Sequence, residues 1–469
     1  MKRTISRITA LGALLAMTAT IPAGAKGNGN GGINPSMMQE LRQSYTPDAA
    51  ARALSNAAAF TSLDKLASTP SQLSAADAHF SHRVPSKGIT DQKSSGRCWL
   101  FTGLNVLRAQ MMRQHGLPTL KLSQNYNFFY DQLEKANLFL QAIIDTADKP
   151  MTDRTVDFLF SNPVSDGGQF TGLSDNIMKY GVVPAEAMCE TFSAENTSQL
   201  RRLLSLKLRE DGLKLRESAA KASPEQLKTE KTAMLKEIYG MLARTLGVPP
   251  TEFTWTRRNK DGKALCTKTY TPLSFYKEFA GNDLKRNYVM LMNDPGREFY
   301  KLYEIDLDRH TYDGENWTYV NLPVEDIKQM AIAAIKDSTA MYFSCDVGKF
   351  FDRKRGVLDI NNYDYDDLMG VTFGMDKADR IRTHASASSH AMTLVAVDLD
   401  KDGKPLKWMV ENSWGPGAND GHLIMTDKWF DEYMFRLVVD RKYVPKRVLD
   451  ILKQTPITLP AWDPLFQDM

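Results

Sequence analysis

A cysteine at the start of an expected helix constrains this chain more than any other feature. The segment Gln92-Lys-Ser-Ser-Gly-Arg-Cys98-Trp99 leads into apolar residues at helical spacing, and Gly116-Leu-Pro118 ends that pattern. We therefore predict an amphipathic helix that begins at Cys98. A thiol at a helix N-terminus has a lowered pKa, because the macrodipole and free N–H groups stabilise the thiolate. The alternative is a buried cysteine in a core helix.

A second constraint is an expected hairpin far downstream. A strand pattern that begins near His390 is followed by a turn at 398–404 and a second strand pattern that reaches Asn412. Residues equally distant from the turn face each other in an antiparallel hairpin, so His390 and Asn412 become neighbours, with Cβ atoms ~5 Å apart. In a catalytic site, His390 would be the base and Asn412 the amide that orients it. The alternative is a structural histidine, which is the more common role of a lone histidine at the start of a strand.

The cysteine segment, His390-Ala-Met and Glu411-Asn412-Ser-Trp-Gly415 together resemble the papain superfamily, and more narrowly its bleomycin hydrolase / aminopeptidase C branch. Further segments resemble that branch in the expected order from about Pro85 to the C-terminus. They are 122–130, 165–170, 179–184, 345–349, 439–442 and 459–464. The separation of 292 residues between cysteine and histidine exceeds the ~130–150 of papain-like enzymes, which indicates a large insertion.

The resemblance implies a role for each matching residue. Cys98 is the expected nucleophile, His390 the general base and acid, and Asn412 its orienting amide. Gln92 is the expected oxyanion donor, together with the backbone N–H of Cys98. Trp414 is expected to shield the bond between His390 and Asn412.

The substrate is expected to lie along a pair of glycines. Asp166-Gly167-Gly168 resembles the glycine wall that holds an extended peptide, since glycine allows two backbones to approach closely. The alternative is an ordinary pair of loop glycines. Together with Trp414 and the C-terminal Met469, Gly167 and Gly168 are the predicted substrate-binding residues.

The first 25 residues have the pattern of a secretory signal. A basic start is followed by an apolar stretch from Ile8 to Ile21 and by Ala23-Gly24-Ala25, an A-x-A cleavage site. We predict export, to the periplasm or outside the cell, after cleavage near Ala25. No later stretch is apolar and long enough to span a membrane.

The charge balance argues against nucleic-acid binding. Removal of the three basic residues of the signal (Lys2, Arg3 and Arg7) reduces the 59 basic residues to 56, which equals the 56 acidic residues. A nucleic-acid partner needs an excess of clustered Lys and Arg. The leucine-rich basic run at 201–216 is better explained as the solvated face of an amphipathic helix.

No metal or cofactor is predicted, because no histidine pair has zinc-ligand spacing and no glycine-rich phosphate loop occurs. Of the four cysteines, Cys345 is expected in a buried strand. Only one disulfide is plausible, between Cys189 and Cys266.

These patterns predict an α+β papain-like fold of two lobes with a large helical insertion and a C-terminal arm. The expected segments are a signal (1–25), a lead-in (26–80), a helical lobe with the nucleophile (81–195), the helical insertion (196–335), a β-rich lobe with His390 and Asn412 (336–445) and the arm (446–469).

The predicted function is a cysteine peptidase, an aminopeptidase acting on unblocked peptides through a thioester acyl-enzyme. Relatives in the branch place a C-terminal carboxylate in the cleft to hold the substrate amine and form six-membered rings, so we expect a homohexamer that binds peptides. The alternatives are a papain-like endopeptidase, a dipeptide-releasing peptidase, or a secreted binding or scaffold protein without activity.

Overall fold

The structure, a computed structural model, describes residues 31–69, 77–85 and 88–465. The predicted signal at 1–25 and the last four residues lie outside the described part. The chain divides into two compact units, residues 1–66 and 67–469. The first unit holds the helices α1 (Pro35–Ser44) and α2 (Ala49–Ala58), and the short helix α3 (Leu63–Ala67) ends at the boundary.

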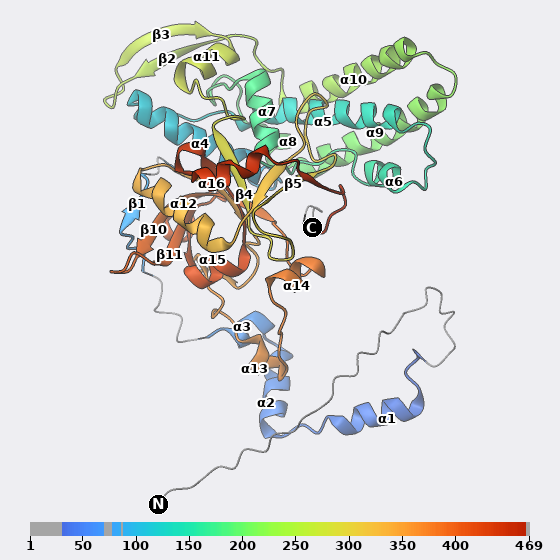
Figure 1. Cartoon of the computed structure of the whole chain (residues 1–469), viewed down its shortest axis with the longest axis vertical. Helices are drawn as coiled ribbons and strands as arrows, with labels where there is room; N and C mark the ends of the chain where they lie inside the picture. The colour runs from blue at the N-terminus through green and yellow to red at the C-terminus, as the bar shows by residue number, and fades with distance from the viewer. Residues whose placement is uncertain (1–30, 70–76, 86–87, 466–469) are drawn as a thin grey trace, which may run out of the picture. The chain divides into compact units, whose positions relative to one another are not determined.

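The second unit contains a helical lobe whose central element is the cysteine helix. The lobe consists of α4 (Cys98–His115), α5 (Gln124–Asp145), α6 (Arg154–Ser161), α7 (Phe170–Tyr180), α8 (Phe192–Glu195), α9 (Thr197–Ala219), α10 (Pro224–Leu246) and α11 (Pro272–Phe279), with the hairpin β2 (Phe253–Arg258) and β3 (Ala264–Tyr270). The long helices α5, α9 and α10 pack side by side (Figure 1).

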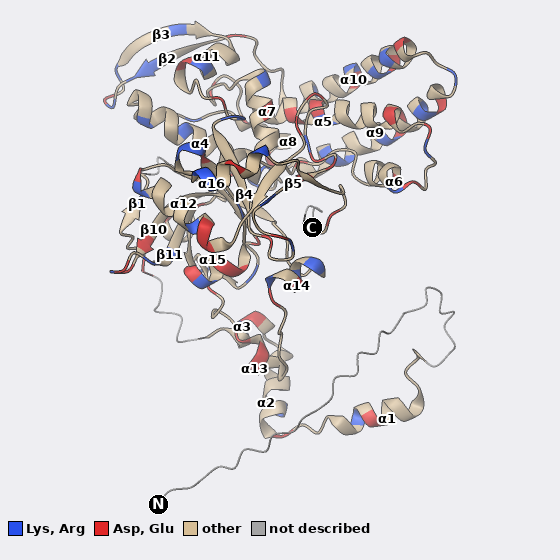
Figure 2. Ribbon diagram, viewed as in Figure 1, with Lys and Arg blue, Asp and Glu red and all other residues tan. Residues whose placement is uncertain are grey.

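The helices of the insertion begin where their sequences provide caps. Ser223 forms a capping box with Gln226, and Pro224 occupies the first turn of α10, where its missing N–H costs nothing. On α9 the leucines Leu204, Leu208 and Leu215 are buried. Basic and acidic residues are interspersed along α9 and α10 (Figure 2). The basic run is therefore the polar side of an amphipathic helix, as predicted.

A mixed sheet forms the β-rich lobe, with twelve strands in the part of the chain that the structure describes. Its strand order is β14-β5-β6-β4-β13-β7-β10-β11-β12-β9-β8, and β1 pairs with β10. The strands are β1 (His82–Arg83), β4 (Tyr288–Met292), β5 (Lys301–Ile305), β6 (Thr318–Asn321), β7 (Met341–Cys345), β8 (Phe351–Asp352), β9 (Val357–Leu358), β10 (His390–Leu399), β11 (Pro405–Glu411), β12 (His422–Thr426), β13 (Met434–Asp440) and β14 (Ile457–Leu459).

Residues of α12 (Val324–Lys336), α15 (Asp427–Tyr433) and α16 (Lys446–Leu449) pack against this sheet. The short helices α13 (Tyr365–Met369) and α14 (Lys377–Arg382) belong to the segment between β9 and β10. One hydrophobic core joins the sheet to α12 and α15. A second core fills the helical lobe and includes Tyr342, Ala391 and Val438 of the sheet, so the two lobes are packed together. Among the described helices, none has the length and apolar character needed to cross a bilayer.

The cysteine helix begins at Cys98 and ends at His115, as predicted, but it is not amphipathic over its first turns. Every residue from Trp99 to Arg108 is buried, including Asn105 and Arg108. Contacts of α4 with α5 and α7 in one lobe, and with β7 and β10 in the other, account for this burial. The polar residues Asn105 and Arg108 are therefore internal partners, whereas Arg113 and Gln114 near the end of the helix are exposed.

The end of α4 depends on a left-handed residue. Gly116 has φ +58°, and its N–H donates to the carbonyl of Met112. We predict that Gly116→Ala lowers the free energy of unfolding by about 1 kcal/mol, since a Cβ disfavours this conformation. Gly116→Asn is the control, because asparagine tolerates left-handed backbone better. Equal stability of the alanine variant and the wild type in chemical denaturation would contradict this explanation of the helix end.

Candidate active site

The nucleophile candidate and the histidine candidate open into one cavity of about 570 Å³. Cys98 lies at the first residue of α4, His390 at the first residue of β10, and both line this cavity with Gln92, Gly167 and Gly168. The sheet and the helical lobe each contribute one reactive side chain. The cavity therefore lies between the lobes, where the sequence analysis expected the cleft.

The hairpin that brings His390 to Asn412 forms as predicted. Strands β10 and β11 pair antiparallel with Thr393 opposite Glu411, and the Nε2 of His390 lies 2.8 Å from the Oδ1 of Asn412. The register differs from the expected one by about two residues, so the two side chains meet diagonally. On the other side, His390 pairs with the buried Cys345 of β7.

Hydrogen bonds determine the tautomer of His390. The Oδ1 of Asn412 also accepts the backbone N–H of Ser413 at 2.8 Å, which identifies this amide atom as oxygen. Because the Oδ1 of Asn412 can only accept a hydrogen bond, the Nε2 of His390 must carry the proton. The Nδ1 of the ring then keeps its lone pair and can act as a base. Such an imidazole can accept a proton from a thiol and return it to a leaving amine.

Burial lowers the pKa of His390 to about 4, although the hydrogen bond to Asn412 opposes this effect. The charge of Arg353 contributes to this lowered pKa. At neutral pH the free ring is therefore a neutral acceptor. Trp414 stacks on the ring, with centroids 4.7 Å apart and 29° between the planes, and its shielding of the bond to Asn412 stays a prediction.

The amide of Gln92 is held in a defined orientation. Its Oε1 accepts the hydroxyl of Ser413 at 2.6 Å, and its Nε2 donates to the carbonyl of Ser95 at 2.5 Å. One N–H of the amide remains for another acceptor. Because Ser413 contacts both Gln92 and Asn412, this serine joins the oxyanion candidate to the orienting amide.

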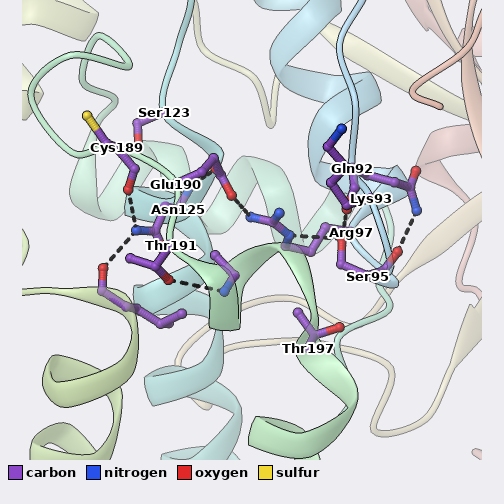
Figure 3. A network of polar contacts seen from close by, with 12 residues as sticks. Gln92, Lys93, Ser95, Arg97, Ser123, Asn125, Cys189, Glu190, Thr191 and Thr197 are labelled. Carbon is purple, nitrogen blue, oxygen red and sulfur yellow. Dashed lines mark hydrogen bonds and ion pairs between the residues drawn. The ribbon is translucent and has the colours of Figure 1, made fainter. Parts of the chain in front are cut away.

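A buried arginine supports the loop between Gln92 and Cys98 (Figure 3). Arg97 is fully buried, its guanidinium lies 2.8 Å from the carboxylate of Glu190, and its Nε donates to the hydroxyl of Ser95. That hydroxyl in turn donates to the carbonyl of Gln92. Burial lowers the pKa of Arg97, and Glu190 opposes the shift. The chain of contacts from Glu190 to Gln92 stabilises the position of the amide donor.

A second buried ion pair joins the lobes. Arg108 of α4 lies 3.3 Å from Glu411 of β11, the residue before Asn412, and both side chains are buried. Burial lowers the pKa of Arg108, whereas Glu411 opposes this effect. This ion pair therefore connects the helix that begins at Cys98 to the strand that precedes Asn412.

We predict that Glu411→Gln lowers the free energy of unfolding by about 3–5 kcal/mol and reduces activity, because it leaves the buried charge of Arg108 without a counterion. The control is Glu210→Gln, which removes an exposed partner of Lys214. This control should leave the thermal midpoint unchanged. Equal midpoints for Glu411→Gln and wild type would contradict the role assigned to the buried pair.

The predicted glycine wall rests on a buried histidine that the sequence analysis did not identify. The Nδ1 of His310 lies 2.6 Å from the carboxylate of Asp131, which also pairs with Lys135 at 2.9 Å. Burial alone would raise the pKa of Asp131, but the charges of Lys135 and His310 outweigh it and lower the pKa. Lys135 also donates to the carbonyl of Gly167 at 2.6 Å.

Gly168 is required by packing. A Cβ at this position would lie 2.3 Å from the His310 ring and 2.9 Å from Trp99. The absence of a side chain thus makes room for His310 and Trp99, while close approach of a substrate backbone stays a prediction. Asp166 fixes the same segment, since its carboxylate accepts the N–H of Gly96 at 2.7 Å.

We predict that Gly168→Ala lowers the free energy of unfolding by about 1–3 kcal/mol through overpacking. In a His310→Ala background the same substitution should cost less, because the crowding ring is gone. A double-mutant cycle by chemical denaturation measures the difference, and strictly additive costs would contradict the packing explanation. If the folded Gly168→Ala variant also has a raised KM, this result would support the predicted contact of Gly168 with the substrate backbone.

The remaining predicted residues have different outcomes. Met469 lies outside the described residues, although Leu465, the last residue described, lines the cavity. All four cysteines are free thiols, with Cys345 buried in β7 as expected, and Cys189 and Cys266 exposed and not bridged. Among the described residues, no cluster of potential ligands could hold a metal ion.

A thiol at a helix start and a neutral imidazole with a fixed tautomer, both lining one cavity, are the groups that cysteine peptidases use for acyl transfer. The sequence model of the Peptidase C1-like family matches residues 32–466. The chain therefore belongs to this family and is a cysteine peptidase of the papain superfamily, in its bleomycin hydrolase and aminopeptidase C branch.

Individual relatives agree. The human protein "Bleomycin hydrolase" is 41% identical over 398 residues, which cover 82% of this chain and 88% of the relative. "Aminopeptidase W" of Lactobacillus delbrueckii subsp. lactis is 37% identical over 434 residues, with coverage of 92% and 99%. The crystal structure of PepW from Lactobacillus rhamnosis superposes with a TM-score of 0.89 at 37% identity, covering 93% of this chain and 99% of that one.

These findings confirm the predicted α+β papain-like fold and the predicted cysteine aminopeptidase. They do not favour the endopeptidase, dipeptide-releasing or inactive scaffold alternatives.

Proposed function

We propose that Cys98 is the nucleophile of amide hydrolysis and that His390 is its base and acid. The observation that carries this proposal is the 2.8 Å contact of His390 with Asn412 at the cavity that Cys98 also lines. The thiol proton passes to Nδ1 of His390 as sulfur attacks the carbonyl carbon. The imidazolium then donates the proton to the leaving nitrogen, which leaves a thioester at Cys98.

The charge on the carbonyl oxygen is stabilised by two donors, the backbone N–H of Cys98 and the remaining N–H of Gln92. Water then attacks the thioester with His390 as the base, and the acid product leaves with regeneration of the thiol. Asn412 keeps the imidazole in the required tautomer throughout, and no metal or cofactor enters the sequence of steps.

We predict that Cys98→Ala and His390→Ala abolish peptidase activity, and that Asn412→Ala is impaired less severely because orientation is a partial contribution. The measurement is kcat/KM for a free-amine aryl amide, with circular dichroism to verify folding. His384→Ala is the control, because this histidine is close in sequence and lies outside the cavity lining. Activity retained by Cys98→Ala would refute the mechanism.

The C-terminal arm supports an aminopeptidase mode in which one residue is released at a time. Leu465, the last residue that the structure describes, lines the cavity. The carboxylate of Met469, with Asp468, offers negative charge to a cationic substrate amine. The bulky Phe466 and Met469 would instead shift how many substrate residues fit, which makes a dipeptide product the second possibility to test.

Deletion of Gln467–Met469 tests this arm. We predict that wild type prefers a free-amine substrate to its acetylated form, and that the deletion variant loses this preference because the negative charge is gone. The two kcat/KM values and mass spectra of the products are the readouts. An unchanged preference would show that another group in the cavity selects the amine.

Oligomeric state and location complete the proposal. The family resemblance supports a homohexamer, which light scattering tests, and a smaller mass at working concentration would contradict it. The A-x-A site supports export with cleavage after Ala25. N-terminal sequencing of the protein from its native host tests that cleavage, and an intact Met1 would exclude it.

A further inference from the structure

A cationic residue lies next to the tryptophan that covers His390. Arg353 belongs to the turn between β8 and β9, and it is exposed. Its guanidinium carbon lies 5.5 Å from the centroid of the Trp414 ring and 5.2 Å from that of Phe351. Trp414 is 37% exposed and lines the cavity, so Arg353 stands at the cavity rim on the side of the histidine.

Arg353 has no anionic partner among the described residues, unlike its neighbour Arg355, whose Nε lies 2.6 Å from Asp352. The guanidinium is held over two aromatic rings, an arrangement that leaves its N–H groups for an external acceptor. Its influence also reaches the reacting group, since its charge lowers the pKa of His390.

The chemistry of the reaction decides which part of a substrate lies at this rim. His390 must donate a proton to the leaving nitrogen, so the residue after the scissile bond contacts His390 and continues over the indole that stacks on it. The leaving part of the peptide therefore passes Trp414 and reaches the neighbourhood of Arg353.

We propose that Arg353 is a specificity-determining residue that binds a carboxylate on the leaving part of the substrate. The carboxylate has two possible sources: an acidic side chain after the scissile bond, or the free C-terminus of a dipeptide. This inference rests on the proposed role of His390 as proton donor.

Two pairs of substrates distinguish the sources. Ala-Asp amide against Ala-Asn amide differs in a side-chain carboxylate, and Ala-Ala against Ala-Ala amide differs in a terminal carboxylate. For each pair the ratio of kcat/KM is measured for wild type and for Arg353→Gln. We expect Arg353→Gln to lower at least one ratio about two- to fivefold, the size of an exposed charge interaction, and the lowered ratio identifies the source.

Lys354→Gln is the matched control, because it removes the same charge from the adjacent, exposed position of the turn. It should keep the wild-type ratios, and an equal loss in this variant would assign the effect to the net charge of the turn and overturn the role of Arg353. Unchanged ratios in Arg353→Gln would also overturn it. Wild-type turnover of Ala-Asn amide tests the proposed function separately, because this substrate has no carboxylate.

Discussion

The active site depends on a junction of hydrogen bonds and one ion pair between the two lobes. The backbone N–H of Gln92 donates to the carbonyl of Ser413 at 2.8 Å, and the hydroxyl of Ser413 donates to the side-chain Oε1 of Gln92. Close by, Arg108 pairs with Glu411 inside the protein. The nucleophile helix and the histidine hairpin come from sequence segments about 300 residues apart. These contacts join the two segments next to the cavity that Cys98 and His390 both line.

Local patterns were sufficient to predict the elements that carry the reactive groups. Helical spacing and a glycine stop located α4, and a turn between two strand patterns brought His390 to Asn412 within about two residues of the observed register. Helical periodicity and turn-forming residues are properties of neighbouring positions in the sequence, so these elements can be predicted without knowledge of the tertiary fold. The motifs then identified the family without any knowledge of the sheet order.

The partners that were not predicted are distant in sequence and carry no local signal. Asp131 and His310 are 179 positions apart, and the expected amphipathic pattern of α4 gave no reason to bury Arg108. Both become internal because two lobes close over the same helix, which is a tertiary effect. Ser413 lay within a recognised motif, but its hydrogen bond to Gln92, 321 positions away, had no signal in the sequence. Gly168 makes room for the His310 ring, a packing constraint that sequence reasoning did not include, and its predicted contact with substrate stays a prediction.

The central claim is that Cys98 forms a thioester with the acyl part of the substrate. Rapid mixing with an ester or amide of an amino acid with a free amine, acid quenching within milliseconds and mass spectrometry of peptide fragments measure it directly. The account predicts a transient mass increase equal to the acyl group on the peptide that contains Cys98. Turnover with no adduct at Cys98, or with the adduct on another residue, would contradict it.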